Sequence, residues 1–132
     1  MNHHSSIELF SSYCYGPADI VAVWRRSRQL QLTLLDSAGR TACATYNGCV
    51  YWQLTGRHAG AHLSLVQQFS ARQLLLLHSS PALKAMQEFT GNIAQQLERW
   101  EKQGCSFYLH MGSFPEEQLL VAAQSLDYEE SD

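Results

Sequence analysis

The stretch that decides the fold is residues 28–55, RQLQLTLLDSAGRTACATYNGCVYWQLT. Leu30, Leu32 and Leu34 alternate with polar residues, which is the period of a strand with one face in the core and one in water. Asn47-Gly48 separates two further strand-like runs, and this dipeptide favours a type I′ hairpin turn because both positions need a positive φ. The stretch predicts three consecutive antiparallel strands over about 28–36, 40–46 and 49–55, with a hairpin at Asn47-Gly48.

Further strands are predicted on both sides of this meander. Residues 7–15 and 19–26 read as strands upstream, and residues 105–110 alternate downstream. The four successive leucines in residues 72–78 favour a buried strand, whereas residues 61–69 fit a helix or a strand equally well. Together these segments predict an antiparallel sheet of about five to seven strands.

Two helices are predicted in the C-terminal part. Ser80-Pro81 has the pattern of an N-cap followed by proline at the first helical position, and the helix over about 81–103 has an apolar stripe ending at Trp100. Ser113 to Glu116 has the pattern of a capping box, which predicts a second helix over about 114–126. The acidic residues 127–132 are expected to fray. The predicted fold class is α+β: one domain over residues 1–126, with the meander sheet packed against both helices.

Composition sets the class of protein. The chain has 132 residues, of which 45% are hydrophobic and 16% charged, as in a single globular domain. No secretory signal and no bilayer-length apolar run is visible, so we expect a cytoplasmic protein without a membrane partner. The four cysteines, Cys14, Cys43, Cys49 and Cys105, are too few for a disulfide scaffold and are expected to be reduced. The sequence alone leaves open whether they approach the histidines in space.

Candidate chemistry is sparse. His58 and His62 have metal-ligand spacing on a helix, but Gly60 between them favours a loop, and no C-x-x-C pair supplies further ligands. Cys105 and His110 would lie on opposite faces of a strand, and no phosphate-binding glycine motif is present. We therefore expect no cofactor and no catalytic residues, and a small enzyme or a metal-binding protein that uses Cys and His is only the third hypothesis.

Charge is unevenly distributed along the chain. Residues 1–80 carry six arginines against three acids, and residues 81–132 carry three basic residues against nine acids. Three of the arginines lie in the segment Trp24–Arg28, and guanidinium groups match phosphates as well as carboxylates. Nucleic-acid or polyanion binding through this segment is the second hypothesis, although the pI of about 6.0 is low for a nucleic-acid domain.

The first hypothesis is a non-enzymatic domain that binds another protein by covering its surface, as a toxin-neutralising immunity protein or an escort chaperone does. A polarised charge distribution favours encounter with a partner of complementary field, and exposed aromatic side chains commonly anchor such interfaces. A homodimer is also compatible with the sequence. The residues predicted to bind the partner are Trp24, Arg25, Arg26, Arg28, Tyr46, Tyr51, Trp52 and Tyr108.

Overall fold

The structure is a computed structural model that describes residues 18–36, 39–55, 62–77, 80–112 and 118–130. It confirms the predicted α+β class with an antiparallel sheet. The elements in chain order are β1 (Ala18–Arg26), β2 (Gln29–Asp36), β3 (Thr41–Asn47), β4 (Tyr51–Thr55), β5 (His62–Phe69), α2 (Ala71–Leu75), α3 (Pro81–Thr90), α4 (Ile93–Lys102), β6 (Ser106–Gly112), β7 (Gln118–Ala123) and β8 (Ser125–Glu130). The strand predicted at residues 7–15 lies outside the described residues.

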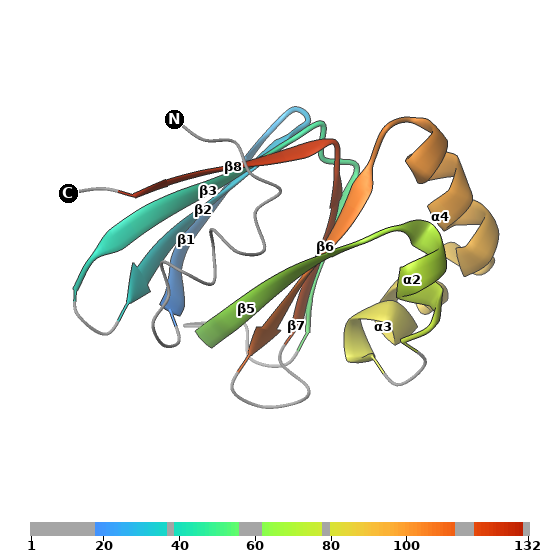
Figure 1. Cartoon of the computed structure of the whole chain (residues 1–132), viewed down its shortest axis with the longest axis horizontal. Coiled ribbons are helices and arrows are strands. Elements are labelled where there is room, and N and C mark those ends of the chain that lie inside the picture. Colours follow the sequence, from blue (N-terminus) through green and yellow to red (C-terminus); the bar gives the residue numbers. More distant parts are fainter. Residues whose placement is uncertain (1–17, 37–38, 56–61, 78–79, 113–117, 131–132) are drawn as a thin grey trace.

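The strands pair antiparallel in the order β4-β7-β6-β5-β1-β2-β3-β8. Two four-stranded halves can be distinguished, because β1 and β5 share only the residue pairs Ala18–Leu63 and Asp19–His62. We call β1-β2-β3-β8 the N-terminal half and β5-β6-β7-β4 the central half. In Figure 1 the N-terminal half lies on the left, the central half in the middle and the helices on the right.

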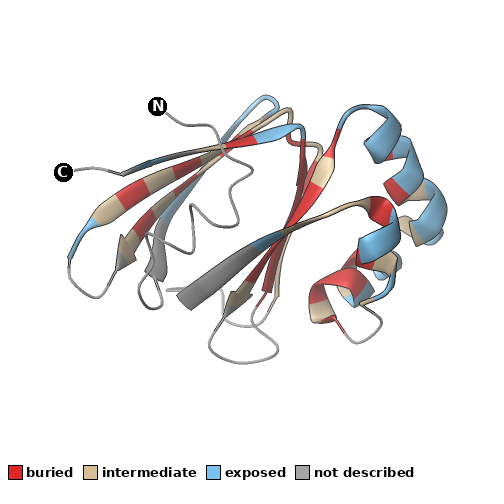
Figure 2. Ribbon diagram, in the orientation of Figure 1, coloured by how far each residue is buried: buried red, intermediate tan, exposed pale blue. Residues whose placement is uncertain are grey.

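Two hydrophobic cores follow from this three-layer arrangement. The core between the two halves includes the alternating leucines of β2, and the core between the central half and the helices includes residues from α2, α3 and α4. All six residues of β7 are buried, because Leu119 and Val121 face the first core while Leu120 and Ala122 face the second. Figure 2 shows buried residues along both sides of this middle layer.

The hairpin predicted at Asn47-Gly48 is wrong, although strands lie on both sides of it. β3 pairs with β2 and β8, whereas β4 pairs with β7. The N–H of Gln124 donates to the carbonyl of Asn47, and the N–H of Val50 donates to the carbonyl of Ala122. The turn therefore carries the chain from the N-terminal half to the central half, beside the place where β7 and β8 carry it back in the opposite direction.

The helix predicted over 114–126 is also wrong. β7 and β8 occupy residues 118–123 and 125–130. A strand buried on both faces has a continuous apolar run, which periodicity does not distinguish from a buried helix. Because β8 reaches Glu130, the prediction of a frayed tail is wrong for residues 127–130.

The strand predicted over 72–78 is replaced by the short helix α2. The Ser70 side chain accepts from the N–H of Gln73, and the Gln73 side chain accepts from the N–H of Ser70. This reciprocal capping box starts the helix and outweighs the strand-like run of leucines that follows. Residues 62–69, which the sequence left open, form the strand β5.

The helix predicted over 81–103 is present as two helices, α3 and α4, that are separated at Gly91. Gly91 has a φ of 81°, a conformation that glycine adopts without steric cost. Ser80 caps α3 as predicted, and the Gln118 Oε1 atom accepts from both the Ser80 hydroxyl and the N–H of Ala82. Gln118 thereby fixes the start of α3 to β7.

We expect Gly48→Ala to destabilise the fold more than Gly39→Ala. Both glycines have a positive φ, for which a Cβ costs about 1–2 kcal/mol. A Cβ at Gly39 meets nothing within 4 Å, whereas a Cβ at Gly48 would lie 2.7 Å from Gln124 Cγ. Displacing Gln124 also breaks its bond to the Gln103 carbonyl, which adds about 1 kcal/mol. Urea unfolding of both variants tests this, and equal losses would contradict the close packing at the crossing.

Candidate protein-binding surface

The segment Ala22–Arg28 is the exposed part of β1 and its turn, and every residue in it is exposed. Two of its members, Val23 and Trp24, are 43% and 45% exposed although they are large and apolar. β1 pairs with β5 only at residues 18 and 19, so the outer edge of residues 22–26 has no strand partner in the described part of the chain. We call residues 22–28 the β1 edge segment.

A β-bulge decides which way its side chains point. The register of β1 on β2 shifts between Ile20 and Ala22. After the shift, Val23 and Arg25 pair with the buried Leu32 and Leu30, so they share the inner face of the N-terminal half. Trp24 and Arg26 pair with Gln31 and Gln29 and share the outer face. The segment therefore offers one apolar and one cationic side chain on each face.

Arginine contacts differ along the β1 edge segment. Arg25 donates from Nη2 to the Cys49 carbonyl and from Nε to the Ser27 carbonyl, both at 3.4 Å. No carboxylate of the described residues forms a hydrogen bond with Arg25, Arg26 or Arg28. Arg25 thus links the segment to the crossing between the two halves through two of its five N–H donors, while the side chains of Arg26 and Arg28 form no hydrogen bond with a described residue.

The outer face of the N-terminal half continues from this segment as a flat array of amides and hydroxyls. Gln29 donates to Asn47 at 3.0 Å, Gln31 donates to Thr45 at 3.3 Å, and Asn47 donates to Asp127 at 3.0 Å. The register brings Asp127 opposite Thr45 in β8, at the far edge. The uneven distribution of charge along the sequence therefore becomes an uneven distribution across one face of the sheet. Arg26 lies at one edge of this face, and Asp127 and Glu129 lie at the other.

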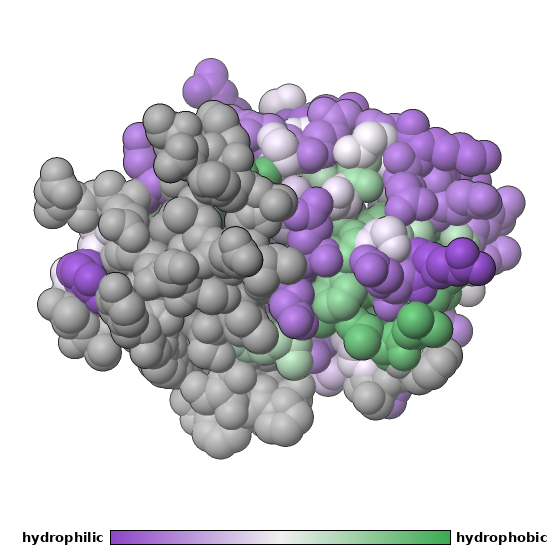
Figure 3. Space-filling model, in the orientation of Figure 1, coloured by the Kyte–Doolittle hydropathy of each residue, from purple (hydrophilic) through white to green (hydrophobic). Residues whose placement is uncertain are grey.

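The helical side carries the other exposed apolar side chains. Leu76 is 68% exposed just after α2, and Phe89 is 72% exposed in α3. Figure 3 shows apolar atoms gathered over α2 and α3 on a side that is otherwise mostly hydrophilic. No arginine of the sequence-predicted set lies on these helices, so this patch is separate from the β1 edge segment.

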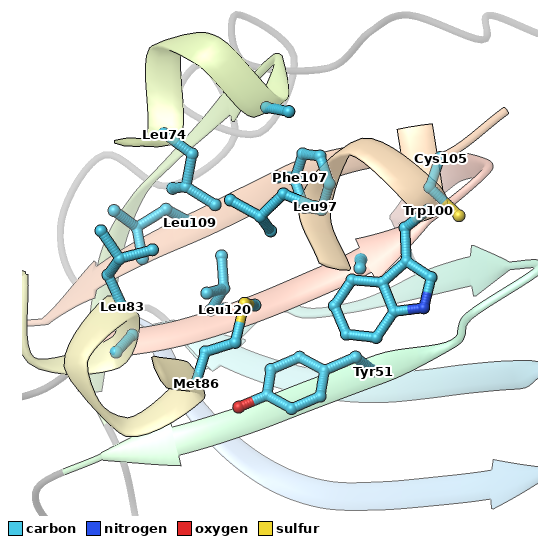
Figure 4. Packing of buried hydrophobic residues seen from close by; sticks show 13 residues of the cluster. Tyr51, Leu74, Leu83, Met86, Leu97, Trp100, Cys105, Phe107, Leu109 and Leu120 are labelled. Atoms are coloured by element: carbon cyan, nitrogen blue, oxygen red, sulfur yellow. The ribbon is translucent and has the colours of Figure 1, made fainter. Parts of the chain in front are cut away.

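Three residues of the predicted binding surface lie in the interior instead. Tyr46 and Tyr108 are 0% and 3% exposed and contact each other edge to face in the core between the halves. Tyr51 is 7% exposed and stacks on Trp100 under the helices, as Figure 4 shows. Trp52 is half-buried and packs against the core between the halves. The prediction of one exposed surface is therefore wrong for the three tyrosines, whose aromatic rings the sequence alone does not distinguish from exposed ones.

The buried pair of Tyr46 and His110 was not anticipated. The Tyr46 hydroxyl forms a hydrogen bond with His110 Nε2, and both residues are 0% exposed. Burial lowers the pKa of His110 to about 3 and raises that of Tyr46 well above its usual value. Perturbed pKa values also mark catalytic groups, but no substrate reaches a pair that is closed on all sides. We assign the pair to the core.

The described cysteines, Cys43, Cys49 and Cys105, do not form a catalytic site with this histidine. Cys105 lies in the core under the helices, on the side of β6 opposite to His110, as the alternation predicts. Burial raises the pKa values of the Cys49 and Cys105 thiols, whereas a nucleophilic thiol needs a lowered one. Cys43 is half-buried beside Thr45, and Cys14 lies outside the described residues.

A metal site finds no support in the residues that can be placed. His58 is outside the described ranges, and the side chain of His62 is not described. Among the described residues, no three His, Cys, Asp or Glu side chains come together to hold a metal ion. Likewise, no helix in this part of the chain is long and apolar enough to cross a membrane.

A hollow of about 440 Å³ lies between β5, β6, α2 and α4. Its polar groups are engaged within the protein: Gln68 donates to Ser106 at 3.0 Å, and Glu101 accepts from the N–H of Ala71 at 3.0 Å. Glu101 therefore accepts from one of the otherwise unpaired N–H groups at the start of α2. The hollow is part of the packing between α2 and the sheet.

The β1 edge segment and the adjoining outer face thus remain the candidate site. Sequence reasoning identified Trp24, Arg25, Arg26 and Arg28 but missed Val23 and the acids of β8. The short contact between β1 and β5, which leaves Val23 at an edge without a described neighbour, has no signal in the sequence, whereas the acidic residues of β8 were visible and were assigned to a tail. No protein-family model matches the chain, and neither a curated protein nor a solved structure matches it.

Proposed function

We propose that this protein is a non-enzymatic domain that binds another protein through the β1 edge segment and the adjoining outer face of the N-terminal half. The observation that carries the proposal is the exposure of Val23 and Trp24 beside Arg26 and Arg28 on a strand edge without a described neighbour. Tryptophan and arginine are the residue types that most often dominate binding energy at protein interfaces. The kind of partner we expect is one that the domain neutralises or escorts by covering it.

A polyanion is the second candidate for the same segment. Arg26 and Arg28 have no carboxylate partner among the described residues, as a phosphate-binding surface requires. The acids Asp127 and Glu129 on the same sheet face oppose this alternative, because they would repel a long polyanion that extended across the sheet. Ionic strength separates the two candidates, since polyanion binding weakens steeply with salt.

Trp24→Ala and Arg26→Ala are expected to abolish capture of the partner in an affinity purification from the native host's lysate. The matched control is Leu76→Ala, which removes an even more exposed apolar side chain from the helical side. We expect the wild type to capture one stoichiometric protein, and this binding should withstand nuclease and high salt. Leu76→Ala should still capture this protein, whereas Trp24→Ala should lower the affinity at least about tenfold, which corresponds to about 1.4 kcal/mol.

Two results would contradict the proposal. Equal capture by the wild type and both β1 variants would exclude this surface as the binding site. Recovery of nuclease-sensitive material alone would replace the protein partner with a nucleic acid. Because the altered side chains are exposed, their replacement should leave the free energy of unfolding within about 1 kcal/mol of the wild type, which thermal unfolding monitors.

A further inference from the structure

The outer edge of β1 at residues 22–26, which pairs with no other described strand, is the starting point for a more specific statement about the partner, and this statement rests on the proposed function. Unpaired edges are ready templates for another strand, and proteins commonly protect them with charge. Protection alone would account for Arg25 and Arg26. It does not account for Val23 and Trp24, which leave apolar surface exposed on both faces of the same edge.

The backbone of this edge is oriented for pairing. β1 and β2 are joined by a two-residue turn at Ser27 and Arg28, and Ser27 has a φ of 54°, as tight hairpin turns require. The residues that flank such a turn form a hydrogen-bonded pair, and the pairs alternate from there. This alternation directs the N–H and C=O groups of Val23 and Arg25 away from β2, toward the outer edge of the strand.

We propose that the partner contributes an extended segment that adds to the outer edge of β1 as a strand, and that this segment carries neighbouring acidic and apolar residues. Residues directly opposite in a strand pair lie on the same face, so the residue opposite Arg26 should be acidic and the residue opposite Trp24 apolar. On the inner face the same rule sets an acidic residue opposite Arg25 and an apolar one opposite Val23. The segment thus has two adjacent acidic residues next to two adjacent apolar residues.

A second copy of this chain fits the edge less well. Pairing of β1 with β1 would bring the arginines of both copies onto one sheet, and like charges on neighbouring strands are destabilising. Pairing of β1 with the acidic β8 of another copy satisfies the charges, but this contact is heterologous, and such contacts form open chains unless the rotation closes into a ring. A separate acidic partner avoids both problems.

The test uses labelled synthetic peptides and the full chain, with fluorescence anisotropy as the readout. Two peptides contain Glu-Glu-Val-Val and Val-Val-Glu-Glu, which cover both strand directions, and a third contains Lys-Lys-Val-Val. We expect one acidic peptide to bind and to lose at least about tenfold in affinity to Arg26→Glu, which corresponds to about 1.4 kcal/mol. The lysine peptide should bind neither protein, because one of its lysines faces Arg25 in both, and near-ultraviolet circular dichroism shows that the Arg26→Glu variant is folded.

Backbone methylation of the peptide then tests the strand itself. A strand uses every second amide in pairing with one neighbour, so N-methylation of one alternate set should abolish binding while methylation of the other set should not. If methylation of the two sets affects peptide binding equally, or if no peptide binds at millimolar concentration, strand addition is overturned. Concentration-dependent self-association that Arg26→Glu abolishes would overturn it too, with a second copy as the occupant.

The two proposals fail in different ways. If the captured partner is lost with Trp24→Ala but neither methylated set matters, the surface binds protein and strand addition is wrong. If Trp24→Ala and Arg26→Ala both capture the partner normally, the surface itself is wrong, and the peptide result then has no bearing on the partner.

Discussion

Acidification from about pH 6.5 to about pH 3 is expected to remove about 4–5 kcal/mol of unfolding free energy through His110 alone. Burial lowers the pKa of His110 from 6.5 to about 3 in the folded protein. Below pH 6.5 the unfolded chain therefore binds a proton that the folded chain excludes, and each pH unit shifts the balance toward unfolding by about 1.4 kcal/mol. The contribution is fully present above pH 6.5 and is lost as the pH falls toward 3.

The surroundings of His110 explain why the proton is excluded. The imidazole lies in the core between the two halves, where the rings of Tyr46 and Tyr108 and the leucines of β2 replace water. Tyr46 supplies a neutral hydroxyl and no negative charge, and the pKa of Tyr46 is itself raised by burial. Burial in this core removes the solvation that an imidazolium needs, and this desolvation lowers the pKa of His110.

His110→Gln is the variant that isolates this effect, because glutamine does not titrate and retains hydrogen-bonding capacity toward Tyr46. Urea unfolding at pH values between 3.5 and 7.5 gives the free energy for both proteins. The difference between wild type and His110→Gln should shrink or reverse with a slope near 1.4 kcal/mol per pH unit below pH 6. A pH-independent difference would show that His110 is accessible to protons in the folded state.

The local patterns of the sequence predicted which segments form strands and helices better than they predicted which strands pair with each other. Leu30, Leu32 and Leu34 define β2, and Ser80-Pro81 defines the start of α3, because each depends on side chains within a few residues. Asn47-Gly48 marks a real turn, but whether the strands beside it pair is decided by β7 and β8, which lie more than seventy residues away. Such long-range competition for a strand edge has no local signature.

In the candidate site, too, local sequence patterns identified some residues, while others depended on tertiary contacts. The arginines and Trp24 could be found from composition, because exposed tryptophan beside arginine is typical of interfaces. Val23 lies beyond the short contact between β1 and β5, and the sequence does not indicate where this contact ends. The three misassigned tyrosines needed tertiary contacts for their placement: Tyr46 is buried by Tyr108 and His110, and Tyr51 by the helices.

Trp100→Ala is expected to cost about 3–5 kcal/mol of unfolding free energy, which is the usual loss when a buried tryptophan is truncated. Trp100 is 9% exposed on α4, and its ring stacks on Tyr51 of β4 with centroids 5.4 Å apart. In Figure 4 the two rings lie side by side at the edge of the core that also contains Met86 and Leu97. The truncation would therefore open a cavity between α4 and the sheet edge.

Phe89→Ala is the matched control. The ring of Phe89 also contacts Tyr51, with ring centroids 5.5 Å apart, but Phe89 is 72% exposed. Phe89→Ala should lower the free energy of unfolding by about 1 kcal/mol or less, since water already covers most of the Phe89 side chain. Both variants are measured by urea unfolding at neutral pH, with near-ultraviolet circular dichroism as a check on tertiary packing. A loss below about 1 kcal/mol for Trp100→Ala would mean that Trp100 contributes little to the core under the helices and would contradict the packing of α4 on the central half.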